Sequence, residues 1–107
     1  MLLTPDVEYR GFNTVDPVSS GWYLTPGTAS NVAFNQACNR IVVQNLSGYT
    51  VYVKFGGATA SPSSYDLVLW GFITAVLSLN FQDVSLYSAS AAHVALWGYR
   101  VDNENLG

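Results

Sequence analysis

The stretch TVYVKFG, residues 50–56, shows most clearly how this chain folds. Apolar side chains recur at every second position, at Val51, Val53 and Phe55, and this alternation is typical of a β-strand with one buried face. The opposite face then carries Tyr52 and Lys54. The segment therefore predicts a strand whose outward face is partly aromatic, which raises the question of what covers that face.

Four further segments have the same β-branched and aromatic character, and we expect each to be a strand. They are NRIVVQN (39–45), YDLVLW (65–70), AVLSLNF (75–81) and HVALWGYRV (93–101). Large side chains fall on the outward faces of these segments too, at Val42, Trp70, Trp97 and Tyr99. Part of the sheet is therefore expected to be covered on both sides.

Short polar and glycine-containing segments separate the expected strands. LSGY (46–49) matches a hairpin turn in which Gly48 is free to take a positive φ. GGATASPSS (56–64) is expected to be a loop, because Pro62 cannot donate the hydrogen bond that a central strand requires. Short strands separated by such turns are typical of an all-β sandwich or barrel.

The N-terminal third of the chain lacks a clear strand pattern. VEYRGF (7–12) is expected to be a first strand or an arm, and residues 13–36 a loop rich in Pro, Gly and Ser with a short strand near residues 22–24. A helix over ASNVAFNQACN (29–39), capped by Ser30, is the alternative. That segment has no Leu, Glu or Lys to favour a helix.

These elements together predict an all-β fold, a single small β-sandwich of jelly-roll type with an extended N-terminal arm. Residues 1–36 form the expected arm and loop and residues 37–107 the sandwich, since a chain of 107 residues has room for one domain. Cys38 is the only cysteine, which excludes an internal disulfide, and it is expected to be buried. The predicted core consists of Ile41, Val43, Val51, Val53, Phe55, Leu77, Leu79, Phe81, Val94 and Leu96.

The composition is unusually apolar for so small a domain. Half of the residues are hydrophobic and 10% are charged, whereas an ordinary soluble protein has roughly 25% charged residues. The net charge of −3 and the absence of a run of Lys and Arg argue against nucleic acid as a partner. We therefore expect another protein to cover part of the surface.

No segment predicts secretion or membrane insertion. MLLTPDVEYR (1–10) has neither a basic start nor a long apolar core, so it does not resemble a signal peptide. LVLWGFITAVLSL (67–79) is too short for a bilayer helix, and Gly71 interrupts it. NLS (45–47) matches a glycosylation acceptor, which carries no weight without a secretory signal. We expect the protein to be made in a reducing cytosol.

The sequence contains no arrangement typical of a catalytic or metal site. Asp66 and Asp83 could form an acid/base pair, but each lies at a strand boundary, where an aspartate commonly caps a turn. Ser90 and His93 could be a nucleophile and a base, yet no G-x-S-x-G elbow is present. His93 is the only histidine, and no cysteine pair accompanies it. We therefore expect no enzyme activity, no cofactor and no bound metal.

Aromatic residues give the strongest functional signal in the sequence. Trp and Tyr supply large rigid contact areas at low entropy cost and are enriched at protein interfaces. We expect self-association as a dimer or trimer, because low charge and two-sided apolar strands leave surface for a second copy to cover. The same rings could instead stack on sugars, as in carbohydrate-binding modules. The predicted interface residues are Tyr9, Trp22, Tyr23, Tyr52, Trp70, Trp97 and Tyr99.

The order of the segments ACNRIVVQN, VYVKFGG, LSLNFQDVSLY and VALWGY resembles that of small β-sandwich accessory proteins of tailed-bacteriophage virions. This group includes capsid decoration or cement proteins and the bases of head spikes. In these proteins an Arg-led apolar strand is followed by a strand–turn unit, a loop and a late strand similar to VALW. The resemblance spans residues 37–101.

The resemblance implies a non-enzymatic virion structural protein, assembled in the host cytoplasm, that binds the major capsid protein or other virion proteins. A cement protein bridges neighbouring capsid proteins and resists the pressure of the packaged DNA. The alternative is a glycan- or receptor-binding module of a phage tail fibre or spike. Neither interpretation requires a cofactor, a nucleic acid or a membrane as partner.

Overall fold

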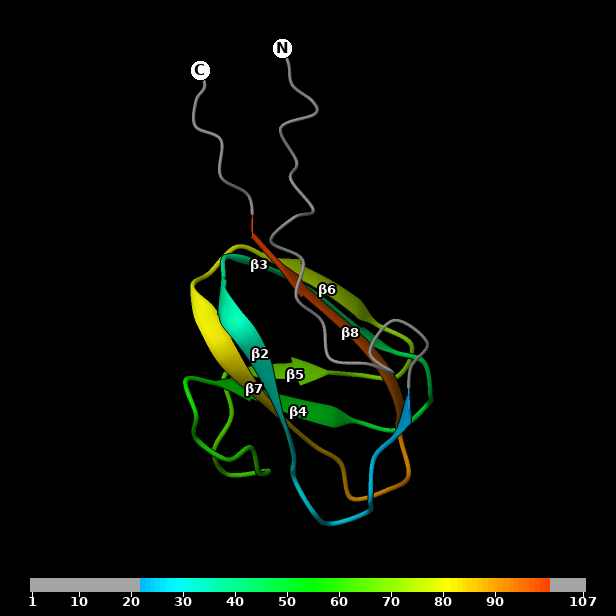
Figure 1. The fold of residues 1–107 in the computed structure, drawn as a ribbon. Helices are drawn as coiled ribbons and strands as arrows, with labels where there is room; N and C mark the ends of the chain where they lie inside the picture. Colours follow the sequence, from blue (N-terminus) through cyan, green and yellow to red (C-terminus); the bar gives the residue numbers. More distant parts are fainter. Residues whose placement is uncertain (1–21, 101–107) are drawn as a thin grey trace.

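The computed structural model describes residues 22–100, apart from the side chains of Trp22, Asn35 and Gln36, and in this range it contains strands, turns and loops but no helix (Figure 1). The predicted all-β fold is therefore confirmed. The strands are β1 (Trp22–Tyr23), β2 (Ser30–Cys38), β3 (Arg40–Asn45), β4 (Val51–Phe55), β5 (Leu67–Leu69), β6 (Thr74–Leu77), β7 (Phe81–Tyr87) and β8 (His93–Tyr99).

The described strands form two antiparallel sheets of four strands each. Sheet A has the order β1-β8-β3-β6, and sheet B has the order β2-β7-β4-β5. Of the strands that follow one another along the chain, β4 and β5 pair with each other, whereas each of the other connections passes from one sheet to the other (Figure 1). The two sheets are thus interleaved in sequence, so that neither could form from one continuous half of the described chain.

The turn at residues 46–49 was predicted to close a hairpin, and this is wrong. The turn leads from β3 in sheet A to β4 in sheet B, and these two strands do not pair. Gly48, which is free to take a positive φ, does not take one; in the described chain, the glycines with a positive φ are Gly27, Gly56 and Gly57. A turn sequence specifies a tight change of chain direction, but not whether the strands on its two sides share a sheet.

The inward faces of the two sheets share one hydrophobic core. The predicted core residues are confirmed: Ile41, Val43, Val51, Val53, Phe81, Val94 and Leu96 are buried, and Phe55, Leu77 and Leu79 pack against them. Cys38 is buried as predicted, and burial raises the pKa of its thiol although the charge of Arg100 acts in the opposite direction. The core also contains residues that the sequence patterns missed, namely Leu24, Phe34, Leu69, Val84, Leu86 and Ala92.

Residues 13–36 were expected to be loop around a short strand, with a helix over 29–39 as the alternative, and for residues 30–38 both expectations are wrong. Residues 30–38 form β2, which pairs with β7 at an edge of sheet B. The register of this pair shifts between Ala33 and Cys38, and such an irregularity breaks the two-residue alternation that identifies a strand. The short strand expected near residues 22–24 is confirmed as β1. The predicted strand or arm at 7–12 lies outside the described residues.

The segment 75–81 was predicted as one strand, but two strands share it. β6 ends at Leu77 in sheet A, and β7 begins at Phe81 in sheet B. Leu79, in the connection between them, packs against the core, so the apolar alternation continues through the crossover. The apolar run 67–79 thus contains β5, a loop and β6, and the described part of the chain has no helix that could cross a membrane.

The two sheets approach each other closely at Gly98. A Cβ atom added to Gly98 on β8 would lie 2.7 Å from the ring of Phe34 on β2, closer than real Cβ contacts allow. We expect Gly98→Ala to lower the free energy of unfolding by about 2 kcal/mol, because overpacking a core displaces side chains or backbone. Denaturant unfolding measures this change. Gly48→Ala is the matched control, since its Cβ would meet the Phe72 ring at an ordinary 3.6 Å; an equal loss in both variants would contradict the close approach.

Candidate functional site

The predicted interface residues do not form one surface. Tyr23, Trp97 and Tyr99 lie on the outer face of sheet A, where Tyr23 is exposed and the other two are half-buried. The backbone of Trp22 lies in β1, but the described residues include neither its side chain nor any part of Tyr9. Half-burial of Trp97 and Tyr99 leaves these two rings with a smaller free surface than the sequence suggested.

Tyr52 lies on the outer face of sheet B in a cluster of three tyrosines. Its ring centroid lies 5.2 Å from that of Tyr65 and 6.2 Å from that of Tyr87. Tyr52 and Tyr87 are directly opposite each other in the β4–β7 register. Tyr65, which precedes β5, is the exposed member of this cluster. Sheet B therefore carries aromatic surface on the face that points away from the core.

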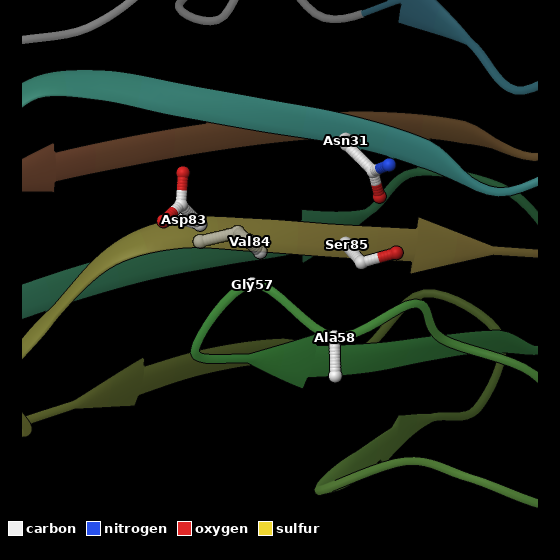
Figure 2. Close-up of a pocket in the computed structure, with 6 residues that line it drawn as sticks. All are labelled: Asn31, Gly57, Ala58, Asp83, Val84 and Ser85. Atoms are coloured by element: carbon white, nitrogen blue, oxygen red, sulfur yellow. The ribbon is translucent and has the colours of Figure 1, made fainter.

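A hollow of about 350 Å³ also lies on this side of the molecule, between the outer face of sheet B and the loop after β4 (Figure 2). It is lined by Asn31 on β2, by Asp83, Val84 and Ser85 on β7, and by Gly57 and Ala58 in the loop. The Ser85 hydroxyl accepts a hydrogen bond of 2.9 Å from the Ala60 amide, which fixes the loop over the sheet. The lining of the hollow therefore includes a side-chain amide, a carboxylate and a hydroxyl.

Trp70 belongs to a different surface, which we call the aromatic tip. The tip consists of Leu46, Tyr49, Trp70, Phe72 and Ile73, and all five side chains are exposed. They come from two loops, 46–50 between β3 and β4 and 70–73 between β5 and β6. Trp70 is 63% exposed and Phe72 is 72% exposed, and neither loop contains a charged residue. Large apolar side chains concentrated in this way on the surface of a small domain indicate a contact surface.

The buried side chain of Asn45 connects the two loops of the tip. Its amide nitrogen lies within hydrogen-bond distance of three backbone carbonyl oxygens, those of Tyr49, Leu69 at 3.2 Å and Trp70 at 3.1 Å. Its side-chain oxygen accepts hydrogen bonds from the amide (3.1 Å) and the hydroxyl (2.8 Å) of Ser47. One side chain at the end of β3 thus fixes both loops. Asn45 is 2% exposed, so the NLS pattern does not present a glycosylation site on the surface of this fold.

Direct contacts between the two loops add to their rigidity. The Phe72 amide donates a hydrogen bond of 2.9 Å to the carbonyl oxygen of Ser47. A Cβ atom at Gly71 would lie 3.0 Å from the Cα atom of Gly48, so the two backbones touch at glycines. A side chain at Gly71 would force the loops apart. The tip is therefore preorganised, and a partner would not have to order it on binding.

Phe72 has a backbone conformation that is unfavourable for its residue type. Its φ is +62°, and in the described chain it is the one residue other than glycine with a positive φ. An L-residue in this region costs about 1–2 kcal/mol. Such strain is retained where the surrounding structure imposes it, and it is concentrated at functional sites. Here it holds an aromatic ring in solvent, which contributes little to the stability of the isolated domain.

This strain predicts an unusual order of stabilities. We expect Phe72→Gly to be more stable than Phe72→Ala by about 1 kcal/mol, because glycine adopts a positive φ without strain and alanine does not. At ordinary exposed positions glycine is the less stable of the two. Denaturant unfolding of both variants measures the difference. If the alanine variant were the more stable one, the strain at this position would be absent.

Three of the residues considered for a catalytic site, Asp66, Asp83 and His93, have other contacts in the structure. Asp66 accepts a 3.0 Å hydrogen bond from the Phe55 amide and pairs with Lys54 at 3.6 Å, whereas Asp83 lines the hollow. The His93 ring stacks on the Tyr23 ring with a centroid distance of 4.4 Å. Within residues 22–100, no three His, Cys, Asp or Glu side chains are close enough together to hold a metal ion. The arrangement can bind a partner through apolar and aromatic contact.

Of the tip residues, Trp70 was predicted as an interface residue, and Phe72 stood out beside it as a second aromatic residue without being included in that prediction. Leu46, Tyr49 and Ile73 were missed. A glycine between two aromatic residues in WGF was the available signal, because it indicates a turn that presents both rings. Comparison of the chain with protein-family models, with curated proteins and with solved structures found no match. The candidate function therefore depends on the sequence pattern and on the geometry of the tip.

Proposed function

We propose that the two sheets form a β-sandwich of jelly-roll type. The pairing of the strands supports this proposal: β1 pairs with β8, β2 with β7, β3 with β6, and β4 with β5. The chain thus resembles one long antiparallel hairpin whose successive pairs alternate between sheets A and B. Eight strands in two sheets of this kind are characteristic of jelly rolls, a fold used in viral capsids and lectins.

The protein functions, in our proposal, as a non-enzymatic structural protein of a tailed-phage virion. It binds the major capsid protein or another virion protein and stabilises the particle. The aromatic tip is the observation that carries the docking function, because it is exposed, uncharged and rigid. Buried aromatic side chains dominate the free energy of binding at protein interfaces. The sequence resemblance supplies the identity of the partner.

The proposal is tested by adding the purified protein to capsids assembled without it. We expect the protein to cosediment with the capsids in a saturable manner and to raise the temperature at which they release their DNA. The isolated major capsid protein serves as a second binding partner in the same assay. Failure to bind either capsids or capsid protein, with a correctly folded sample, would overturn the virion assignment.

A glycan-binding function is the second candidate, and the outer face of sheet B favours it. The hollow combines the polar side chains of Asn31, Asp83 and Ser85, and the exposed ring of Tyr65 lies in the tyrosine cluster on the same face. Sugars bind to such combinations of planar rings and hydrogen-bonding groups. A glycan screen that finds millimolar or tighter binding, lost in both Tyr65→Ala and Asp83→Ala, would favour this function over capsid docking.

A further inference from the structure

The strand β6 is the last strand of sheet A, and one of its backbone edges has no neighbour among the described strands. The backbone N–H of Asn45, at the end of β3, donates a 2.9 Å hydrogen bond to the Ile73 carbonyl oxygen. Hydrogen-bonded pairs alternate along an antiparallel ladder, so the next residue of β6 to bond β3 is Ala75. The amide and carbonyl groups of Thr74 and Val76 therefore point away from β3, toward the free edge.

This edge lacks the charges and prolines that commonly prevent strands from pairing between molecules, although β6 is only four residues long. Residues 67–82 contain neither a charged residue nor a proline. By contrast, the edge strand β2 has an irregular register, and the edge strand β5 is three residues long and follows Asp66, which pairs with Lys54. Bulges, charges and short length are the usual protections of an edge strand. Of these three edges, β6 has neither bulge nor charge to protect it.

The outer face of sheet A next to this edge is apolar. In the sheet register, Trp97 on β8 lies beside Val42 on β3, and Val42 lies beside Val76 on β6. The three side chains form a row across the sheet that ends at the free edge. Val76 is 65% exposed, although it is a β-branched apolar residue in a strand. The row thus ends at Val76, beside which the described strands place no further strand.

We propose that β6 pairs antiparallel with β6 of a second copy of this chain. The two-fold axis of this dimer places Val76 opposite Val76 of the other copy. This register continues the row Trp97–Val42–Val76 into its own symmetry mate and places the exposed Thr74 opposite the exposed Ser78. A two-fold interface brings the same segment of the two copies together, so like charges would repel, and this segment has none. Sheet A becomes one sheet of eight strands.

The dimer leaves both aromatic tips free, because each tip precedes β6 and the two strands run in opposite directions. At about 3.3 Å per residue, the Phe72 positions of the two copies are on the order of 25 Å apart along the joined strands. The dimer therefore presents two docking surfaces from opposite ends of one continuous sheet. This dimer requires no capsid to form, so it can be tested whether or not the proposed virion function is correct.

The test is the oligomeric state of the purified full chain by analytical ultracentrifugation. We expect a dimer for the wild type and for Val76→Thr, and a monomer for Val76→Lys, which places two like charges at the axis. Ala89→Lys, which adds the same charge at an exposed bend between β7 and β8, should remain a dimer. Because association itself raises the melting temperature, melting is compared at a concentration below the dimer dissociation constant, where all four proteins are monomers. Equal melting temperatures there would show that the changes act on association and not on folding.

A second variant defines the register. We expect Val76→Cys to form a disulfide-linked dimer under mild oxidation, which a reductant reverses, whereas the buried Cys38 of the wild type should form none. A monomeric wild type at high concentration, a trimer, or a dimer that Val76→Lys leaves intact would each overturn the proposal. A dimer that forms without a cross-link in Val76→Cys would overturn the register.

Discussion

Replacing Asn45 with alanine is expected to lower the free energy of unfolding by about 3 kcal/mol, because it removes a buried side chain that makes several hydrogen bonds. The carbonyl oxygens of Tyr49, Leu69 and Trp70 lose the side-chain NH2 group whose two hydrogens they share, and Ser47 loses the acceptor of its amide and hydroxyl. A buried polar group left without a partner costs about 1–3 kcal/mol. The summed loss is smaller than the number of these groups implies, because the loops lie at the surface and water can reach some of them.

The neighbouring residue Gln44 provides the control. Its amide nitrogen lies 3.5 Å from the Thr74 hydroxyl in an exposed position, so Gln44→Ala should change stability by less than about 0.5 kcal/mol. Hydrogen exchange adds a local reading: in Asn45→Ala, the Phe72 amide should lose protection more than the amides of the central strand β7. A variant with wild-type stability and an unchanged Phe72 amide would mean that the two loops hold each other without Asn45.

Removal of both large rings of the tip, in Trp70→Ala/Phe72→Ala, is expected to weaken binding to capsids at least about 100-fold. Each aromatic anchor of an interface contributes about 2 kcal/mol or more, and 1.4 kcal/mol corresponds to a tenfold change in Kd. The effects of neighbouring residues do not add fully, so the expected loss is set below the simple sum. Both rings are mostly exposed in the isolated protein, so its melting temperature should change little.

Tyr23→Ala is the matched control for this experiment. Tyr23 is 67% exposed, comparable to the two tip residues, but it lies on sheet A and stacks on His93. Its removal should change capsid binding by less than about threefold, as expected for a residue outside a hot spot. If Tyr23→Ala and the double variant weakened binding equally, exposed aromatic surface in general, and not the tip, would be responsible.

The strands that could be predicted from the sequence are those whose two faces differ. In β3, β4 and β8 the residues at alternate positions face the core, and their apolar pattern identified Ile41, Val53 and Leu96 correctly. β7 is different because its apolar residues do not keep one phase: Phe81 and Val84 lie three positions apart and both belong to the core. Ser85 is buried although it is polar, because the loop after β4 covers it from outside. This contact joins segments that are distant in sequence, so the local pattern does not indicate it.

The candidate site was less predictable because its decisive features are not local. The positive φ of Phe72 could not be predicted from its residue type, because bulky aromatic residues rarely adopt this backbone conformation. The contact between Gly48 and Gly71 joins loops that the sequence assigned to separate turns. Trp70 was identified because its large ring falls on the outward face of an expected strand. The surrounding residues Tyr49 and Ile73 became part of a site only when the fold brought the loops together.

The most direct test of the docking account is a cryo-electron microscopy map of capsids with the protein bound, at a resolution that places side chains. If the tip docks as proposed, loops 46–50 and 70–73 face the capsid, and the rings of Trp70 and Phe72 are buried against an apolar surface of the major capsid protein. A map in which both loops point into solvent, while the outer face of sheet A or sheet B makes the contact, would contradict it.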